Sequence, residues 1–311
     1  GYKDDCKLIS AGVDKEVINE DITITTWQSI YKMPKKWFDQ FNVVIGDEAH
    51  LFKAKSLTTI MTRLSDCKYR FGFTGTLDGT ETHKLVLEGL FGQVQSFVKT
   101  KQLIDGDTLA DLKIKILVLK YNEATKKAHK EDKFHDEMDF ITQNSKRNNF
   151  ISNLTLSLEG NTLVLFSFVE KHGKVLYDLV NNKVAKNRKV FFVFGGTDAD
   201  TRESIRAITE KENNAIIIAS YGTFSTGINI RNLHNIVFAS PSKSRIRNLQ
   251  SIGRGLRKSD SKSQCTLYDI ADDLQYKKSV NHTLRHLYER VKIYNEEQFD
   301  YKMYKIRLES D

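Results

Sequence analysis

Short apolar runs recur along the chain, and longer stretches with helical spacing of apolar residues separate them. Several runs lack the period-two alternation of a strand with one solvated face, so they predict strands that are covered on both faces. A parallel sheet flanked by helices produces this pattern, and we therefore predict an α/β fold. The predicted strands are residues 43–46, 70–74, 113–119, 162–168, 189–194, 215–219, 235–239 and 265–270.

The length predicts about two domains, because 311 residues exceed the usual size of one hydrophobic core. Residues 123–150 carry interleaved charges of both signs, which is typical of a solvated connecting helix. We therefore predict a first domain over 1–122, a connecting segment over 123–150 and a second domain over 151–275. Residues 276–311 are expected to form a helical extension that packs on the second domain, and its basic residues could also touch a phosphate backbone.

The composition indicates which kind of partner and which cellular compartment to expect. Lys and Arg outnumber Asp and Glu by 48 to 40, and this net charge of +8 favours a polyanionic partner. The three cysteines are far apart and have neither metal-ligand spacing nor a disulfide framework, which indicates a reducing compartment. The sequence has no apolar stretch long enough for a bilayer and no signal-peptide character at its start, so we expect a cytoplasmic protein without a membrane partner.

Two adjacent carboxylates, Asp47 and Glu48, follow the predicted strand 43–46. Ligands of open parallel sheets gather beyond the carboxyl ends of the strands. An acid there can hold Mg²⁺, usually through water, while its neighbour orients or deprotonates the water that attacks a γ-phosphate. The alternative is a pair of acids that stabilises the start of a helix at Ala49. For an Asp-Glu dipeptide alone the alternative would be favoured, but the four letters "DEAH" and the motifs downstream favour catalysis.

Two later segments also follow predicted strands. "FGFTGTL", residues 71–77, is by itself a glycine-containing turn. "ASYGTFSTGINI", residues 219–230, predicts a loop of glycines and small hydroxyl residues, which suits phosphate contact. An ordinary strand-to-helix loop is the alternative for the second segment.

The segment "QSIGRGLRK", residues 250–258, is the most specific signal. On a helix, Gln250, Arg254 and Arg257 would fall at positions i, i+4 and i+7 and share one face. Two guanidinium groups on one face can stabilise the charge of a transferring phosphoryl group. The alternative is an ordinary basic helix surface.

Taken in order, these segments resemble the later motifs of a superfamily 2 helicase, and within that superfamily the branched-DNA helicases. The resemblance covers about residues 22–271. Its motifs are "ITTWQS" (24–29), "DEAH" (47–50), "TGT" (74–76), "LVLF" (163–166), "GG" with Arg202 (195–202), "TFSTGIN" (223–229) and "QSIGRGLR" (250–257). It implies two RecA-like domains that face each other across a nucleotide cleft, ATP and Mg²⁺ as cofactors, and branched or forked DNA as the partner.

The resemblance also implies a role for each matching residue. Asp47 would bind Mg²⁺, Glu48 would be the catalytic base, and His50 would link the nucleotide state to the second domain. The residues that would couple hydrolysis to domain motion are Thr74, Gly75 and Thr76. The nucleotide would be contacted from the second domain by Gly227, Asn229, Gln250, Arg254 and Arg257. The nucleic-acid backbone would be held by Thr26, Gln28, Ser29, Gly196, Arg202, Thr223 and Thr226.

One departure from the family is plain. A motor of this type needs a phosphate-binding loop, G-x-x-x-x-G-K-[ST], and this sequence contains none. The nearest segment, "HGKVL" at 172–176, has Val175 where Ser or Thr is required, and helix surface is the simpler explanation. Since the loop precedes "DEAH" in the family, we expect a fragment whose first domain is incomplete at its N-terminus and which hydrolyses little or no ATP alone.

The intact protein is then expected to be an ATP-dependent DNA helicase or translocase in recombination, replication restart or repair. Two alternatives stay open. The first is an RNA helicase or the motor subunit of a restriction system. The second is a nucleic-acid-binding module with an inactive nucleotide site.

Overall fold

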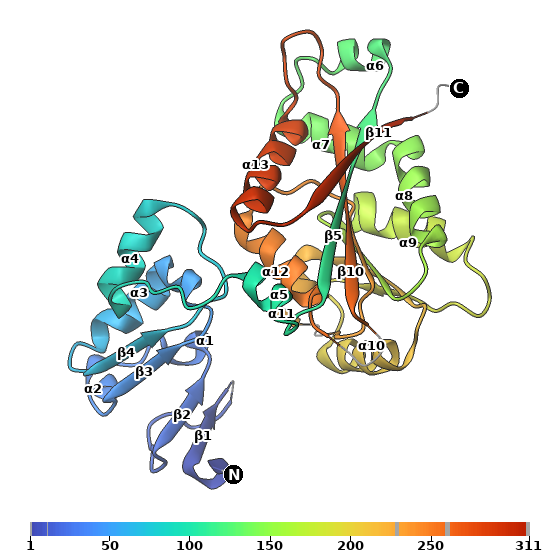
Figure 1. Ribbon diagram of the computed structural model, residues 1–311. Coiled ribbons are helices and arrows are strands. Elements are labelled where there is room, and N and C mark those ends of the chain that lie inside the picture. Colours follow the sequence, from blue (N-terminus) through green and yellow to red (C-terminus); the bar gives the residue numbers. More distant parts are fainter. Residues whose placement is uncertain (1, 11, 228–229, 259–261, 309–311) are drawn as a thin grey trace. The chain divides into compact units, whose positions relative to one another are not determined.

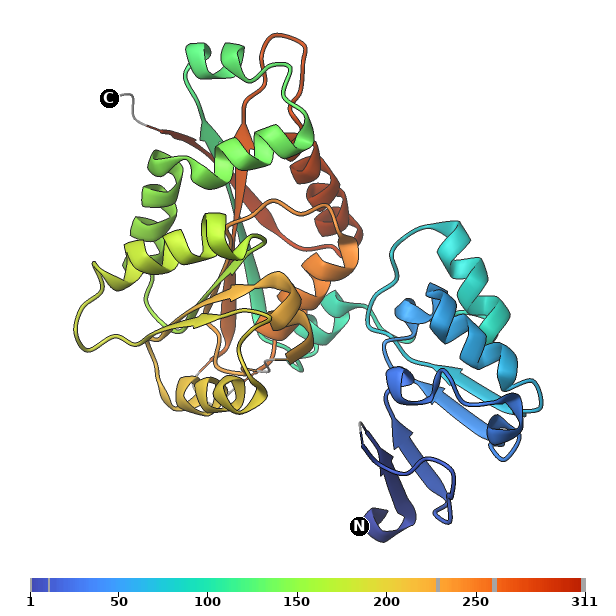
Figure 2. The same cartoon turned by 180° about the vertical axis from the view of Figure 1, so that it is seen from behind.

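The computed structural model describes residues 2–10, 12–227, 230–258 and 262–308, without the side chains of residues 2 and 225–227. The chain divides into two compact units, Gly1–Ser96 and Phe97–Asp311 (Figures 1 and 2). Each unit has its own hydrophobic core. The two units are therefore described one at a time.

The first unit contains two parallel strand pairs. Strand β1 (Cys6–Ile9) pairs with β2 (Ile22–Thr25), and β3 (Val43–Gly46) pairs with β4 (Tyr69–Gly72). Its α-helices are α1 (Trp27–Ile30), α2 (Lys35–Phe38), α3 (Lys55–Arg63) and α4 (Glu81–Phe91), and its 3₁₀ helices are Tyr2–Asp5 and Ala49–Lys53.

Close packing on one face of the β3–β4 pair depends on two paired glycines. Gly46 lies opposite Gly72, and a Cβ atom on either would come within 3.1 Å of the Phe91 ring. The rings of Phe52 and Phe91 contact each other in an edge-to-face arrangement beside these glycines. Helix α4 and the turn after β3 are therefore held close to the sheet.

The second unit is built on a seven-stranded parallel sheet with the order β11-β5-β10-β9-β6-β8-β7. Its strands are β5 (Asp111–Lys120), β6 (Thr162–Phe166), β7 (Val190–Val193), β8 (Ile216–Ser220), β9 (Asn235–Phe238), β10 (Gln264–Asp273) and β11 (Tyr301–Arg307). Its helices are α5 (Thr100–Asp105), α6 (Glu123–Ala128), α7 (Phe134–Gln143), α8 (Ser145–Ser157), α9 (Lys174–Asn181), α10 (Ala199–Lys211), α11 (Tyr221–Gly227), α12 (Arg245–Gly255) and α13 (His282–Glu296), with a π-helical turn over Val169–Gly173.

Helices cover both faces of this sheet. One core contains Ile252 of α12 and Leu287 of α13, and the other contains Ile141 of α7 and Leu176 of α9. Figure 1 shows the sheet from its β11 edge, with α12 and α13 on one face and α8 and α9 on the other. The α/β prediction is therefore confirmed, and each of the eight predicted strands is present. No helix in the described part of the chain is both long enough and apolar enough to span a bilayer.

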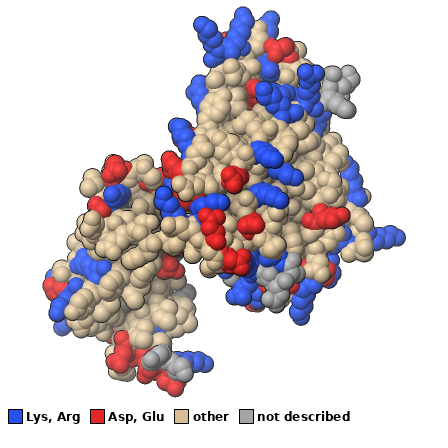
Figure 3. Space-filling view, in the orientation of Figure 1, with Lys and Arg blue, Asp and Glu red and all other residues tan. Residues whose placement is uncertain are grey.

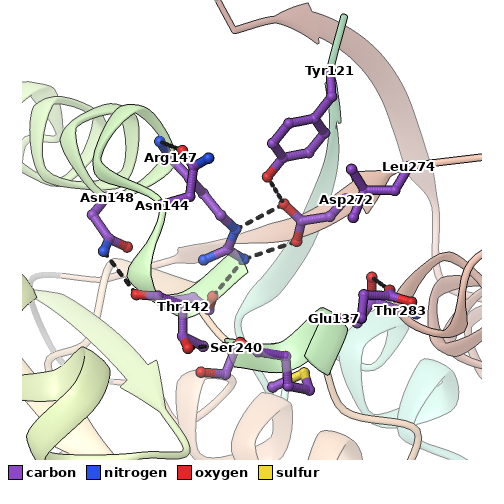
Figure 4. Close-up of polar contacts among 12 residues, drawn as sticks. Tyr121, Glu137, Thr142, Asn144, Arg147, Asn148, Ser240, Asp272, Leu274 and Thr283 are labelled. Atoms are coloured by element: carbon purple, nitrogen blue, oxygen red, sulfur yellow. Dashed lines mark hydrogen bonds and ion pairs between the residues drawn. The ribbon is translucent and has the colours of Figure 1, made fainter. Parts of the chain in front are cut away.

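The domain boundaries differ from the prediction. Strand β5 belongs to the sheet of the second unit, so that unit begins near residue 97 and not at residue 151 as predicted. The charged segment 123–150 is also part of this unit, because Glu137 and Arg147 are 1% and 0% exposed. Figure 4 shows Arg147 paired with Asp272 inside the unit. The charge pattern was misleading because it did not reveal which charges have buried partners.

The C-terminal extension follows the prediction only in part. Helix α13 packs on the sheet through Leu284, Leu287 and Tyr294, as its apolar spacing indicated. The residues after it form β11, which adds to the edge of the sheet beside β5. This strand carries exposed lysines, so its sequence lacks the apolar character on which the other strands were recognised.

Candidate nucleotide and nucleic-acid sites

The turn after β3 carries the two predicted catalytic carboxylates. Asp47 and Glu48 follow the carboxyl end of the strand, and Asp47 Oδ1 accepts a hydrogen bond of 2.8 Å from the Glu48 amide. Glu48 has a left-handed backbone with φ of 47°. This backbone conformation costs a non-glycine residue about 1–3 kcal/mol, so contacts with the surrounding structure hold Glu48 in it. The Glu48 side chain makes no capping hydrogen bond to the 3₁₀ helix that follows, so helix capping does not explain why an acid occupies this position.

Backbone hydrogen bonds tie this turn to the neighbouring strand. The amide of Ala49 donates to the carbonyl of Phe73 at 2.9 Å, and the amide of Phe73 donates to the carbonyl of Gly46 at 2.8 Å. The segment that follows β4 therefore holds the segment that follows β3 in position. This brings "DEAH" and "TGT", which are 24 residues apart in sequence, next to each other.

His50 and Thr74 join these two segments through their side chains. His50 is buried, and its Nδ1 lies 2.9 Å from Thr74 Oγ1 and 3.2 Å from Glu48 Oε2. The Thr74 hydroxyl donates to the carbonyl of Thr76 at 2.9 Å, so its oxygen is left to accept from His50. Burial lowers the pKa of His50, although the Glu48 carboxylate opposes that shift. A neutral imidazole with its proton on Nδ1 satisfies these contacts.

Sequence reasoning missed a second layer behind His50. His83 of α4 is buried, with Nε2 at 2.8 Å from the His50 carbonyl oxygen and Nδ1 at 2.8 Å from Asp78 Oδ1. Lys53 Nζ lies 3.0 Å from Asp78 Oδ2. Burial raises the pKa of Asp78, but hydrogen bonds from Thr80, Lys53 and His83 outweigh it and hold that pKa below its usual range. No motif marks His83 or Asp78, because their contacts arise only from folding.

The first predicted nucleic-acid group lies together at the end of β2. Thr26 is the N-cap residue of α1, and its hydroxyl lies 3.1 Å from that of Ser29. Thr26 and Gln28 are exposed, and Ser29 is partly exposed. The structure therefore brings these three residues to one accessible helix start.

In the second unit, Gly196 and Arg202 lie on either side of the start of α10. The Asp198 carboxylate caps that helix by accepting from the Thr201 amide at 2.8 Å. Arg202 is partly exposed in the first turn of α10. A Cβ atom on Gly196 would lie 2.6 Å from the Phe194 ring, so a larger residue would displace that ring.

The loop predicted over 219–230 is wrong over most of its length, because Tyr221–Gly227 forms α11. Thr223 is only 6% exposed, and its hydroxyl lies 2.8 Å from that of Ser220. Thr226 and Gly227 end the helix, and their side-chain environment is not described. Asn229 lies outside the described residues.

The predicted guanidinium helix is confirmed for two of its three residues. Gln250 and Arg254 lie on α12, but the helix ends at Gly255, so Arg257 lies beyond it and does not share its face by helical spacing. The Arg254 guanidinium lies over the Phe224 ring, 5.6 Å from its centre, which links α12 to α11. A Cβ atom on Gly255 would lie 2.5 Å from Ile236 Cδ1, so the helix is seated closely on β9.

Asp47 fits the chemistry of a magnesium ligand. Its carboxylate is exposed at a strand end, and the described residues contain no cluster of three or more metal-binding side chains that would form a complete protein cage. Mg²⁺ commonly binds one or two carboxylates, with water and substrate phosphates completing its coordination. Asp47, with Glu48 beside it, is suited to that arrangement.

Comparison with known proteins agrees with this geometry. Residues 2–79 match the family model of the type III restriction enzyme res subunit, and residues 145–259 match that of the helicase conserved C-terminal domain. The ATP-dependent DNA helicase uvsW of Enterobacteria phage T4 is 35% identical over 308 residues, which are 95% of this chain and 61% of that protein. The chain thus spans less than two thirds of this relative.

Three further comparisons involve lower coverage or lower identity. The crystal structure of T4 UvsW has a TM-score of 0.56 at 34% identity, over 98% of this chain and 62% of that one. A fragment assigned as an HsdR subunit of a type I restriction enzyme from Vibrio vulnificus has a TM-score of 0.72 at 18% identity, over 99% of this chain and 56% of that one, which shows the fold alone. A protein of Acanthamoeba polyphaga mimivirus, provisionally named an ATP-dependent RNA helicase, is 23% identical over 84% of this chain and 50% of its own length.

The parallel sheets, with carboxylates, hydroxyl groups and guanidinium groups after their strands, agree with the RecA-like fold of helicases. The chain belongs to the superfamily 2 helicases and is UvsW-like within them.

Proposed function

We propose that the intact protein is an ATP-dependent helicase or translocase that acts on DNA. The observation that carries the proposal is the contact between His50 and Thr74, which joins the carboxylate turn to the next strand end. A change of charge or position at Glu48 reaches Thr74 through one buried imidazole. A motor needs such a link, because nucleotide chemistry has to be converted into movement of the chain.

In this proposal Asp47 holds Mg²⁺, which neutralises charge on the nucleotide phosphates, and Glu48 accepts the proton of the attacking water. The residues that couple hydrolysis to domain motion in this proposal are Thr74, Gly75 and Thr76. Gln250, Arg254 and Arg257 stabilise the phosphates from the second unit, and closure of the two units on the nucleotide alternates with opening. Gly227 and Asn229 are proposed to add to the nucleotide contacts.

We propose that a phosphate-binding lysine outside these 311 residues completes the nucleotide site. The exposed face of the β3–β4 pair supports this part of the proposal. Val43 and Ile45 are 49% and 66% exposed, and their partners Tyr69 and Phe71 are each 48% exposed. Cross-strand pairs of large apolar residues are stable when covered. We propose that further strands of the first motor domain cover this face.

DNA is the proposed partner, with Thr26, Gln28, Ser29, Gly196, Arg202 and Thr226 along its backbone. Thr223 is too buried to contact DNA in this structure. Thr26 and Gln28 are accessible for phosphate contacts, which position a strand without reading its sequence. The choice of DNA rests on the name of UvsW of phage T4, a DNA helicase. We further propose branched or forked DNA as the substrate, and a role in recombination, replication restart or repair in the cytoplasm, because the ordered motifs resemble those of the branched-DNA helicases. An RNA substrate is the second candidate, because the name of the mimivirus relative points to it.

The test is ATP hydrolysis by the protein extended to include its phosphate-binding loop. Forked DNA should stimulate hydrolysis more than plain duplex or RNA, and Glu48→Gln should lower kcat by about 100-fold or more while ATP still binds. Glu81→Gln, at an exposed carboxylate in the first turn of α4, is the matched control and should leave the rate unchanged. Stronger stimulation by RNA, or an unaffected rate in Glu48→Gln, would contradict the proposal.

A further inference from the structure

An open basic and aromatic surface lies on the second unit, on strands β10, β5 and β11. We call it the lysine–tyrosine face, and it consists of Lys113, Lys115, Tyr268, Lys302 and Tyr304. The register places Tyr268, Lys115 and Lys302 in one row across the three strands. Lys113 and Tyr304 lie two positions away along their strands, and because side chains alternate along a strand, all five point to the same side of the sheet.

These side chains are accessible. Lys113 and Lys302 are exposed, Tyr304 is 40% exposed, and Lys115 and Tyr268 are partly exposed. The Lys115 ammonium lies over the Tyr268 ring, 5.3 Å from its centre. Figure 3 shows blue side chains following one another along the β11–β5 side of the second unit. Farther along the same side of the sheet, Leu119 and Ile270 are buried in the core with α7, α8 and α9, so the helices leave this end uncovered.

A cleft of about 700 Å³ adjoins the face. It is lined by Lys113, Lys115, Lys302 and Tyr304, and by Lys101 and Ile104 of α5. Two carboxylates, Asp111 and Asp300, also line it, so four lysines face two acids. Lys101 is in addition paired with Asp105 at 3.3 Å. The cleft therefore keeps a positive excess beside accessible aromatic rings.

Protection of a sheet edge explains only part of this surface. Lysines on an edge strand prevent pairing with other chains, which accounts for Lys302 on β11. That explanation does not cover Lys113 and Lys115, because β5 is an interior strand between β10 and β11. The register also sets Lys115 directly beside Lys302. Like charges on facing positions destabilise a sheet, so folding alone gives no reason for this pair.

We infer that the lysine–tyrosine face binds single-stranded nucleic acid, with bases stacked on Tyr304 and phosphates held by Lys113, Lys115 and Lys302. Proteins that bind single strands combine basic tracks with aromatic rings on which bases stack. The surface is separate from the motif residues Gly196 and Arg202. Those residues follow the carboxyl end of β7, at the opposite edge of the sheet, whereas the face lies toward the amino ends of β5 and β11. The lysine–tyrosine face is therefore an additional contact, beyond those of the proposed function, for a strand that leaves the motor.

The inference can be tested by fluorescence anisotropy with the 311-residue chain and a labelled thymidine oligonucleotide of about 16 nucleotides. Lys113→Ala combined with Lys302→Ala should weaken binding about tenfold and lower the slope of log affinity against log salt by about 1.4, since two phosphate contacts are lost. Lys186→Ala combined with Lys211→Ala removes the same charge at exposed positions elsewhere on the unit and is the matched control. The control should leave the slope nearly unchanged.

A second pair of variants separates stacking from charge. Tyr304→Leu should weaken single-strand binding about fivefold or more, whereas Tyr304→Phe keeps the ring and should bind like the parent chain. An oligonucleotide with 5-bromouracil should cross-link to the peptide that contains Tyr304. Far-UV circular dichroism of each variant checks that the second unit is folded.

The outcomes separate this inference from the proposed function. If the parent chain binds the oligonucleotide and the Lys113/Lys302 variant has the same affinity and salt slope as the control variant, the lysine–tyrosine face is not a nucleic-acid site. The proposed function stands in that case. Duplex DNA that binds as tightly, with no effect of Tyr304→Leu, would overturn the single-strand assignment. If the parent chain binds no nucleic acid of any kind, the inference fails, and the proposed function is then judged by ATP hydrolysis of the extended protein.

Discussion

The imidazole of His50 and the hydroxyl group of Thr74 lie 2.9 Å apart, although the two residues are 24 positions apart in the chain. Each residue follows a different strand of the β3–β4 pair, so the hydrogen bond reports the relative position of the two strand ends. His83 holds the His50 backbone from the other side at 2.8 Å. The turn that carries Asp47 and Glu48 is therefore positioned by buried polar contacts and not only by apolar packing.

Replacing Thr74 with Val should destabilise the first unit by about 0.5–1.5 kcal/mol, because the buried His50 Nδ1 would lose its hydroxyl partner and keep only Glu48, at 3.2 Å. Thr74→Ser keeps the hydroxyl and should cost less. Urea unfolding followed by tryptophan fluorescence measures this unit alone, because both tryptophans, Trp27 and Trp37, belong to it. Equal stability of the Val and Ser variants would show that the contact contributes little.

Two glycines of α12 should respond in opposite ways to the same substitution. Gly255→Ala places a methyl group 2.5 Å from Ile236 Cδ1 and 2.9 Å from Cys265 Sγ, and should destabilise the second unit by about 1–3 kcal/mol. Gly253→Ala meets nothing within 4 Å and should stabilise the helix by about 0.5–1 kcal/mol. Chemical unfolding followed by far-UV circular dichroism compares the two. Similar effects from both would show that α12 is not seated as described.

The buried pair of Arg147 and Asp272 should show strong coupling (Figure 4). Two Arg147 nitrogens reach the carboxylate at 2.8 and 3.0 Å, and Tyr121 donates to the same group at 2.8 Å. Asp272→Asn leaves the guanidinium buried beside a neutral group and should cost about 3–5 kcal/mol. A double-mutant cycle of Arg147→Met and Asp272→Leu, measured by chemical unfolding, should give a double variant more stable than the sum of the single losses predicts. Simple additivity would contradict a direct interaction.

The second unit should lose stability as the pH falls below about 6.5. Burial lowers the pKa of His172 well below its ordinary value, and burial together with Arg290 lowers that of His286 to about 4. At a pH between the two pKa values, the unfolded chain binds protons that the folded chain does not. The stability that the neutral histidines contribute is therefore fully present above their pKa in the unfolded chain, and it is lost as the pH falls toward their pKa in the folded chain. Each histidine contributes a slope of up to about 1.4 kcal/mol per pH unit.

The check is a series of urea unfolding curves between about pH 7 and pH 5, followed by circular dichroism. His172→Asn keeps a polar side chain opposite Ser240, which lies 3.0 Å from His172 Nδ1, but it does not titrate. This variant should show a shallower loss of stability with acid than the parent chain. An unchanged pH profile would mean that His172 remains neutral in both states or is accessible to protons in the folded unit.

Local patterns predicted most of the elements and the position of the turn that carries Asp47 and Glu48. Apolar runs such as 162–168 and 215–219 mark strands covered on both faces, and the acids after 43–46 lie where a strand-end site was expected. The extent of the guanidinium helix was overestimated, because Arg257 follows a helix that ends at Gly255. A helical-spacing argument cannot locate a helix end when the residues beyond it have similar composition.

By itself the sequence predicted the fold class and the order of eight of the eleven strands described, because these depend on short-range patterns of burial. The residue types of "DEAH" and "TGT" also indicated the chemistry that we propose for them. Only the tertiary structure decided that β5 joins the second sheet, that β11 lies beside it, and that His83 and Asp78 support His50. The reason is physical: strand neighbours and buried charge partners are selected by contacts between distant parts of the chain, and each partner is stable only when the other is in place.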